Sequence, residues 1–405
     1  MESSLLLLIL LFVTLSVFGQ IEESKLKQHI KILSADSLQG RGTGSEGERM
    51  AATYIEAQFK KIKLQPLGDD KKYLQSFPFK GGVHGTGPEG KANNIIGLID
   101  NGAANTVIIG AHYDHLGLGE NGSSLDANPQ GKIHNGADDN ASGVAGLIEL
   151  ARYFKKNKAK EKNNFLFIAF SGEELGLFGS KYFAEHPLLD LSKVNYMLNM
   201  DMIGRLDPAT KTIAVSGTGT SSVWEAELKK LSSDDLKIKT DSAGVGPSDH
   251  TSFYLKNIPV LQFFTGSHSD YHKPSDDWDK INYAGEKSVL ELIIKLVNDI
   301  DATPKLTFLT TKNKSMGSAR SFKVTMGVMP SYTSNEEGLK VDDVIEGKPA
   351  QKAGIISGDV IVQMGELIIK DIQAYMEALG KFQKGQRVPV KVKRGNEVLT
   401  YIVTF

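Results

Sequence analysis

The chain has 405 residues, a length typical of two domains. Its 47 basic and 48 acidic residues give a formal charge of −1, so no large basic surface is implied and nucleic acid is not an expected partner. The sequence contains no cysteine, which excludes disulfides, thiolate catalysis and cysteine-based zinc sites.

The first 19 residues, MESSLLLLILLFVTLSVFG, are typical of an export signal peptide. The uncharged run from Ser3 to Gln20 is too short and too early for a membrane span, which needs about 20 apolar residues. Glu2 disagrees with this interpretation, because signal peptides usually begin with basic residues. We expect export to the periplasm or the extracellular space, with no stable membrane span in the mature chain; the alternative is an uncleaved anchor.

Helical and strand-like patterns alternate over residues 20–303. Residues 24–64 are helical in pattern, with a Gly-rich interruption at LQGRGTGSEG. Apolar runs typical of strands buried on both faces follow at 94–99, 106–112, 165–170, 195–201 and 259–264. Helical patterns follow residues 140 and 220, and a last helix ends near residue 300. This alternation predicts an α/β domain with a mostly parallel sheet and helices on both faces.

Binding sites in such sheets lie at the carboxyl ends of the strands, and five separate segments place imidazoles or carboxylates there. These segments are AHYDH at 111–115, GADDNASG at 136–143, SGEELGLFGS at 171–180, LNMDMIGR at 198–205 and DYHKPSDD at 270–277. Many carboxylates converge in a protein only if a cation neutralises them, because an unpaired buried charge is costly. Imidazole and carboxylate without thiolate suit zinc, or less often manganese or cobalt.

The adjacent Glu173 and Glu174 follow the apolar run FLFIAF. One of them can bind a metal while the other stays free as a base beside it. The alternative is that the pair lies at the start of a helix, where carboxylates interact favourably with the helix dipole.

Taken in order, the five segments resemble the motifs of the M28 family of di-zinc aminopeptidases, over roughly residues 24–300. The resemblance implies a zinc-exopeptidase-like fold and two Zn²⁺ per chain. The metal ligands that it implies are His112, Asp139, Glu174, Asp201 and His272.

The resemblance also implies a role for each of these positions. Asp139 bridges both metals, and the peptide bond between Asp139 and Asn140 is cis. Glu173 is the general base, and Asp114 orients His112. Two ligands, His112 and Asp201, complete one metal's set, while Glu174 and His272 complete the other.

The implied function is an exported metallo-aminopeptidase. It hydrolyses the N-terminal residue of peptides with a free N-terminus, using a water that two zinc ions activate and Glu173 as general base. A glutaminyl cyclase-like transferase on the same fold is an alternative, although it works with one zinc and does not need His112. A carboxypeptidase is another, and would need a cation such as Arg205 to hold a substrate carboxylate. A non-catalytic binding protein is disfavoured, because every expected ligand is present.

Four residues near these motifs have weaker interpretations. His115 and His268 lie close to the predicted site without an assigned role. Arg41 in LQGRGTG is interpreted as a structural loop anchor. Val245 stands where some M28 members have an aromatic hydroxyl residue, so an oxyanion contact from that position is lost or supplied elsewhere.

The tail is a separate unit. Residues 304–320 are predicted to be a linker, and residues 321–405 contain short strands and two helices. They resemble a PDZ domain of the bacterial protease type, most specifically in KPAQKAGIISGDVIVQMGE. This implies that Met326, Gly327 and Val328 receive a peptide or protein C-terminus, which adds as a strand. The alternative is a module that only packs on the catalytic domain or caps its cleft.

Overall fold

The structure is a computed structural model. It describes residues 20–80, 89–120, 122–157, 159, 161–311, 324–331, 333–334 and 336–405. The predicted signal peptide, residues 1–19, lies outside the described residues. None of the helices in these ranges has both the length and the apolar character needed to cross a bilayer.

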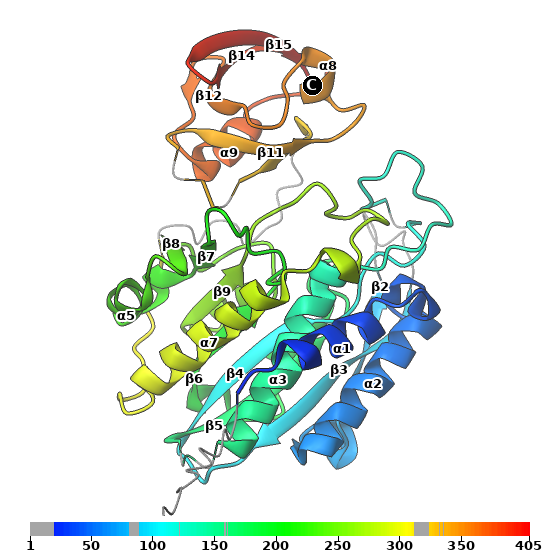
Figure 1. Ribbon diagram of the computed structural model, residues 1–405, viewed down its shortest axis with the longest axis vertical. Coiled ribbons are helices and arrows are strands. Elements are labelled where there is room, and N and C mark those ends of the chain that lie inside the picture. The colour runs from blue at the N-terminus through cyan, green and yellow to red at the C-terminus, as the bar shows by residue number, and fades with distance from the viewer. Residues whose placement is uncertain are drawn as a thin grey trace, which may run out of the picture.

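The larger module is built on a nine-stranded mixed sheet of order β1-β3-β5-β4-β6-β9-β7-β8, with β2 paired to β3 (Figure 1). Its strands are β1 (Gln65–Pro66), β2 (Leu74–Lys80), β3 (Glu89–Ile99), β4 (Asn105–His112), β5 (Asn163–Phe170), β6 (Val194–Met200), β7 (Thr212–Ser216), β8 (Lys237–Asp241) and β9 (Val260–Phe264). The central strands β5, β4, β6 and β9 run parallel, whereas β3 and β7 join them antiparallel. The predicted α/β fold with a parallel centre is therefore confirmed.

Helices cover both faces of this sheet, as predicted. One face carries α1 (Glu23–Leu33), α2 (Glu46–Ile62), α3 (Gly143–Lys156), α5 (Trp224–Leu231) and α7 (Tyr283–Ile300), and the other carries α4 (Phe178–Glu185) and α6 (His250–Tyr254). Alternate residues of each central strand enter opposite cores: Val107 and Ile109 of β4 pack in one, and Ile108 packs in the other. A strand buried on both faces is uniformly apolar, which explains why these runs could be recognised.

The smaller module has its own antiparallel sheet, of order β10-β11-β12-β14-β15, with β13 paired to β12. Its elements are β10 (Val328–Pro330), β11 (Leu339–Val344), α8 (Pro349–Ala353), β12 (Val360–Met364), β13 (Leu367–Ile368), α9 (Ile372–Leu379), β14 (Arg387–Arg394) and β15 (Glu397–Thr404). An apolar core formed only by residues of this module includes Val341, Ile361, Val390 and Val403. In Figure 1 this module lies beyond the carboxyl ends of the parallel strands.

The segment after α7 packs on the larger module before the chain reaches the smaller one. Leu306 is buried in the larger core, and the ring of Phe308 lies 5.4 Å from that of Tyr254. The hydroxyls of Tyr254 and Thr311 are 3.0 Å apart. The first part of the predicted linker therefore packs on the larger module, and its residues 312–320 lie outside the described residues.

One buried side chain, Arg41, ties together the loops at the carboxyl end of the sheet. Its guanidinium donates to the carbonyl oxygens of Tyr113 at 2.8 Å, Asn135 at 2.7 Å and Gly136 at 2.9 Å, and also to that of Leu33. The side chain is fully enclosed, and burial lowers its pKa to about 10. These contacts are those of a structural anchor, because they join α1 to the segments that follow β4.

We expect Arg41→Met to lower the free energy of unfolding of the larger module by about 3 kcal/mol, since four buried carbonyls lose a charged donor. Urea unfolding followed by tryptophan fluorescence measures this, because both tryptophans, Trp224 and Trp278, lie in the larger module. Arg49→Met is the matched control, since Arg49 is an exposed arginine paired with Glu46. Equal stability of the two variants would contradict the anchor role.

Candidate metal centre

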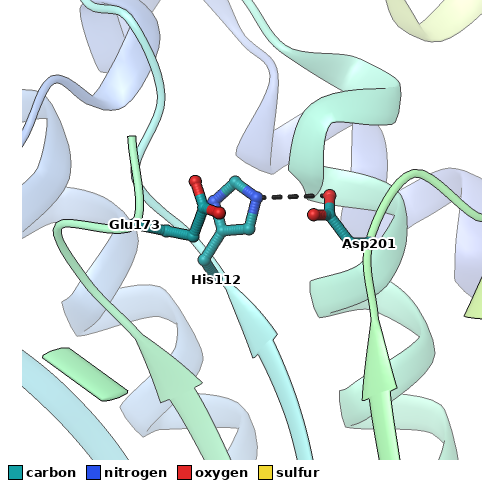
Figure 2. A group of neighbouring side chains, drawn as sticks. All are labelled: His112, Glu173 and Asp201. Carbon is teal, nitrogen blue, oxygen red and sulfur yellow. Dashed lines mark hydrogen bonds and ion pairs between the residues drawn. The ribbon is translucent and has the colours of Figure 1, made fainter. Parts of the chain in front are cut away.

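Three predicted residues meet at the ends of neighbouring strands: His112, Glu173 and Asp201 (Figure 2). His112 is the last residue of β4, Asp201 follows β6, and Glu173 lies in the turn after β5. His112 Nε2 lies 3.3 Å from Asp201 Oδ1. Each of the three residues offers a ligand atom, and these atoms all lie within 4.8 Å of one another. This set is called cluster A below.

A second set, called cluster B, consists of His115, Asp139, Glu174 and His272. His115 Nδ1 lies 2.7 Å from Glu174 Oε1, and His272 Nε2 lies 3.3 Å from Glu174 Oε2. His272 Nε2 also lies 3.2 Å from Asp139 Oδ2. Five segments that are distant in sequence are thus brought to one edge of the sheet.

Asp139 lies between the two clusters. Its Oδ1 is 3.3 Å from His112 Nε2 in cluster A, and its Oδ2 faces His272 in cluster B. One carboxylate therefore addresses both groups with different oxygens, as a bridging ligand would.

The loop around Asp139 is held by its neighbours. The Asp139–Asn140 peptide bond is cis, as the M28 resemblance implies. Asn140 donates through Nδ2 to the carbonyl of Met200 at 3.0 Å, which ties the loop to the end of β6. The carboxylate of Asp276 accepts from the backbone N–H of Asp139 at 3.1 Å. These contacts fix where the Asp139 carboxylate points.

Asp114 organises the turn that carries the two glutamates. Its carboxylate accepts the backbone N–H of Glu173 at 3.1 Å and that of Glu174 at 3.4 Å, and the hydroxyl of Thr43 at 2.8 Å. The next helix, α4, begins only at Phe178, so the glutamate pair lies in a turn. The alternative of a favourable helix-start position is therefore wrong.

The carboxylates and imidazoles of the site perturb one another strongly. Burial alone would lower the pKa of His112 and of His272, but neighbouring carboxylates raise both well above the ordinary value. Burial opposes ionisation of Glu174, yet His272 and His115 lower its pKa to about 2. Burial, reinforced by Asp201 and Glu174, instead raises the pKa of Glu173 well above its usual range. The two adjacent glutamates therefore differ in their tendency to ionise.

The donor set fits a pair of zinc ions. All candidate ligand atoms are imidazole nitrogens or carboxylate oxygens, the combination expected where no thiolate exists. The side chain of Asp139 is only 4% exposed and that of Glu174 only 5%, so two carboxylates share one buried space. Cations there would replace the positive charge that the imidazoles supply in this structure.

His115 was not assigned from the sequence, and the structure places its ring in cluster B. Its Nε2 is buried without a hydrogen-bond partner among the described residues. The available signal was its place in AHYDH, three residues after His112. His268 instead lies beside the clusters, with Nε2 3.2 Å from Asp138 Oδ2.

The structure also places Val245 and Arg205. Val245, which has no hydroxyl, is buried in the apolar core with Phe253. Arg205 pairs with Asp270, whose Oδ2 lies 3.3 Å from Nη2.

The segment predicted to bind a peptide C-terminus lies where β10 begins. Met326 is buried, and Gly327 has a φ of 76°, which favours glycine. The carbonyl of Gly327 accepts from Ile345 N at 2.9 Å. Among the described strands, β10 is the end strand of its sheet, so its second edge can accept another strand.

Comparison with known proteins agrees with this geometry. Residues 94–297 match the sequence model of peptidase family M28, and residues 324–404 match that of the PDZ domain. The chain therefore belongs to peptidase family M28 and carries a PDZ domain after the peptidase domain.

Two relatives share 31% identity with the chain. The uncharacterized protein YfbL of Escherichia coli strain K12 matches over 221 residues, which is 47% of this chain and 66% of YfbL. Aminopeptidase YwaD of Bacillus subtilis strain 168 matches over 190 residues, which is 44% of this chain and 37% of YwaD. The matches thus span less than two thirds of either relative.

Two solved structures share the fold. Glutaminyl cyclase from Porphyromonas gingivalis has a TM-score of 0.56 at 20% identity, covering 69% of this chain and 99% of that one. BSAP, a zinc aminopeptidase from Bacillus subtilis, has a TM-score of 0.51 at 20% identity, covering 72% of this chain and 99% of that one. At these identities the likeness concerns the fold alone.

We expect Asp139→Ala to lose both zinc ions, because its two carboxylate oxygens face different clusters. Metal analysis after dialysis against zinc should give close to two ions per wild-type chain and close to none in the variant. Asp235→Ala is the control, since its side chain is 96% exposed. Retention of one tightly bound ion by Asp139→Ala would limit Asp139 to a single metal.

Proposed function

We propose that the protein is an exported zinc aminopeptidase, periplasmic or extracellular, that removes the N-terminal residue from peptides with a free N-terminus. The observation that carries this proposal is that one carboxylate, Asp139, faces both clusters, with Glu173 as a member of cluster A. Membership in family M28 and the name of YwaD support it. We further propose a peptidase domain at 20–303 and a PDZ domain at 321–405, joined by a linker at 304–320.

The proposed ligand sets are drawn from the two clusters and leave out Glu173 of cluster A and His115 of cluster B. His112 and Asp201 would hold one zinc, Glu174 and His272 would hold the other, and Asp139 would serve both. Bound zinc makes a water more acidic and polarises the scissile carbonyl. Of the remaining residues, Glu173 is proposed to transfer the proton and Asp114 to hold the site residues in position.

Glu173 is the proposed general base. Its buried surroundings raise its pKa, so its carboxylate takes a proton readily and can pass it to the leaving amine. Asp114 holds the backbone of the Glu173 turn and meets the His112 ring through its carbonyl oxygen, 3.2 Å from Nδ1. Asp114 is therefore a positioning residue, which holds Glu173 and His112 in place relative to each other.

A glutaminyl cyclase-like transferase is the second candidate, and the fold shared with the Porphyromonas gingivalis enzyme favours it. It would need one zinc and no second ligand set. His112 lies close to both Asp201 and Asp139, so the ligands for a second metal are grouped together. This grouping supports two metals, and therefore the peptidase. Carboxypeptidase activity would require a cation at the metals themselves, whereas the Arg205 side chain contacts Asp270 and not the members of either cluster.

The PDZ domain is proposed to take the C-terminus of a peptide or protein at Met326, Gly327 and Val328. The end position of β10 supports strand addition there.

Glu173→Gln should keep both zinc ions and lower kcat on a leucyl anilide by about 10²–10⁴-fold, since general base catalysis contributes that much. Glu174→Gln is the matched comparison, and should lose one zinc because Glu174 is proposed as a ligand. Metal content and kcat on the same samples separate the two roles.

Two outcomes would count against this assignment. Near-normal kcat in Glu173→Gln would move the base elsewhere, and loss of zinc in that variant would make Glu173 a ligand of cluster A. If N-acetylated substrates are cleaved as fast as free ones, the aminopeptidase proposal is wrong.

A chain ending at Thr311 should hydrolyse small neutral aminoacyl anilides with a kcat/KM close to that of the full chain. Every proposed ligand lies between His112 and His272, and the segment up to Thr311 stays packed on the larger module. Thermal unfolding and metal content verify that the shortened protein is intact. If it folds and binds two metals yet cleaves no anilide, the PDZ domain contributes directly to catalysis.

A further inference from the structure

An open cavity of about 650 Å³, with a mixed polar and apolar lining, lies between the peptidase and PDZ domains. Three segments of the peptidase domain form one side: 205–210 after β6, 265–268 after β9 and 280–282 before α7. Ser331, Ser334 and Lys340 of the PDZ domain line the other side. Neither domain alone encloses this space, which is called the interdomain pocket below.

The interdomain pocket adjoins the metal centre. Thr265, in its wall, donates through Oγ1 to the carbonyl of Met202 at 2.7 Å, and Met202 directly follows Asp201. His268, also in its wall, lies 3.2 Å from Asp138, which directly precedes Asp139. Residues next to Asp201 and Asp139 thus contact the wall of the pocket, although no member of either cluster lines it.

On the peptidase side of the pocket, two cationic side chains pair with only one carboxylate. Arg205 and Lys280 both line the pocket and share the single carboxylate of Asp270, at 3.3 Å and 2.6 Å. The Arg205 pair is long and uses one oxygen, so the guanidinium has capacity for a further acceptor. Its side chain is only 20% exposed, which limits screening by water.

The PDZ domain adds a third cation and a neighbouring acid. Lys340 of β11 lines the pocket and pairs with Glu336, which is 53% exposed. Asp207 and Asp342 also line the pocket. Oδ1 of Asp207 is occupied by backbone N–H groups of its own loop, and burial raises the pKa of Asp342 to about 6. Asp342 therefore opposes an incoming anion less as the pH falls through about 6.

We propose that the interdomain pocket binds a carboxylate of the peptide substrate, with Arg205 and Lys280 as its main partners. The inference rests on the proposed aminopeptidase function and narrows its substrate class to short or acidic peptides. The carboxylate is either the C-terminus of a peptide a few residues long or an acidic side chain. The PDZ domain then forms one wall of the substrate site.

The kinetic test compares peptides that differ only in one charge. For the C-terminal source, kcat/KM is measured on Leu-Gly-Gly and on its C-terminal amide; for the side-chain source, on the amides of Leu-Asp and Leu-Asn. The full-length wild type should prefer the charged member of at least one pair by about tenfold, the effect of one charge-assisted hydrogen bond. The pair that shows the preference identifies the source.

In Arg205→Ala this charged-to-neutral ratio should fall to near one, with the change mainly in KM. Arg49→Ala, an exposed arginine paired with Glu46, should keep the wild-type ratio. Lys280→Met should lower the ratio as well, and serves if Arg205→Ala fails to fold. A wild-type ratio near one for both pairs, or a ratio that survives both substitutions, would overturn the proposal.

An equilibrium measurement separates this proposal from the proposed function. Calorimetric titration of the same four peptides into the full-length Glu173→Gln protein needs no turnover. If no peptide is hydrolysed by the wild type but the charged peptides bind tighter and lose that preference with Arg205→Ala, the pocket is supported and the aminopeptidase activity is not. If the wild type hydrolyses peptides without any charge preference, in turnover or in binding, the activity holds and the pocket proposal is wrong.

Discussion

Mutual repulsion among carboxylates is the constraint that shapes this protein. Asp139, the adjacent Glu173 and Glu174, and Asp201 arrive from three separate segments at one edge of one sheet, where water cannot fully screen them. In the structure, imidazole nitrogens lie 2.7–3.3 Å from the carboxylate oxygens of Asp139, Glu174 and Asp201. Such an arrangement is costly in a fold without a compensating cation, so the surrounding loops must be held by other contacts. The side chains of Asp114, Asn140 and Asp276 supply those contacts by hydrogen bonding to backbone groups.

Much of the fold and of the site could be predicted because the relevant signals are local. The parallel strands are buried on both faces, so each appears as an apolar run followed directly by its functional residue, as with His112 after β4. By contrast, β8 is a polar edge strand and β7, TIAVS, has only three apolar residues, so neither stood out in the sequence. His115 is a different case, since its place in cluster B depends on a contact with Glu174, 59 residues away, that no spacing encodes.

The way in which the two domains contact each other was harder to predict from the sequence than the family of each domain. The PDZ pattern is local, but contacts between the domains are not. Lys273 directly follows the proposed ligand His272, and its Nζ lies 3.6 Å from Asp343 of the PDZ domain. Lys239 likewise donates to the carbonyl of Ser334. These are single polar contacts between residues of ordinary composition, so only the assembled structure shows that the PDZ domain lies beside the metal centre.

The buried Arg41 makes the active-site edge depend on the beginning of the peptidase domain. Its partners include Leu33 at the end of α1 and Asn135 just before the metal-site loop, 94 positions along the chain. During synthesis the segment before β4 emerges first, and its arginine lacks the carbonyls of Asn135 and Gly136 until residue 136 has followed. A chain cleaved just after Arg41 would keep every proposed ligand and lose the covalent connection of α1 to the loop that Arg41 holds at Asn135 and Gly136. Protease sensitivity near Arg41 and metal affinity should therefore vary together, although about 100 residues separate Arg41 from Asp139 in sequence.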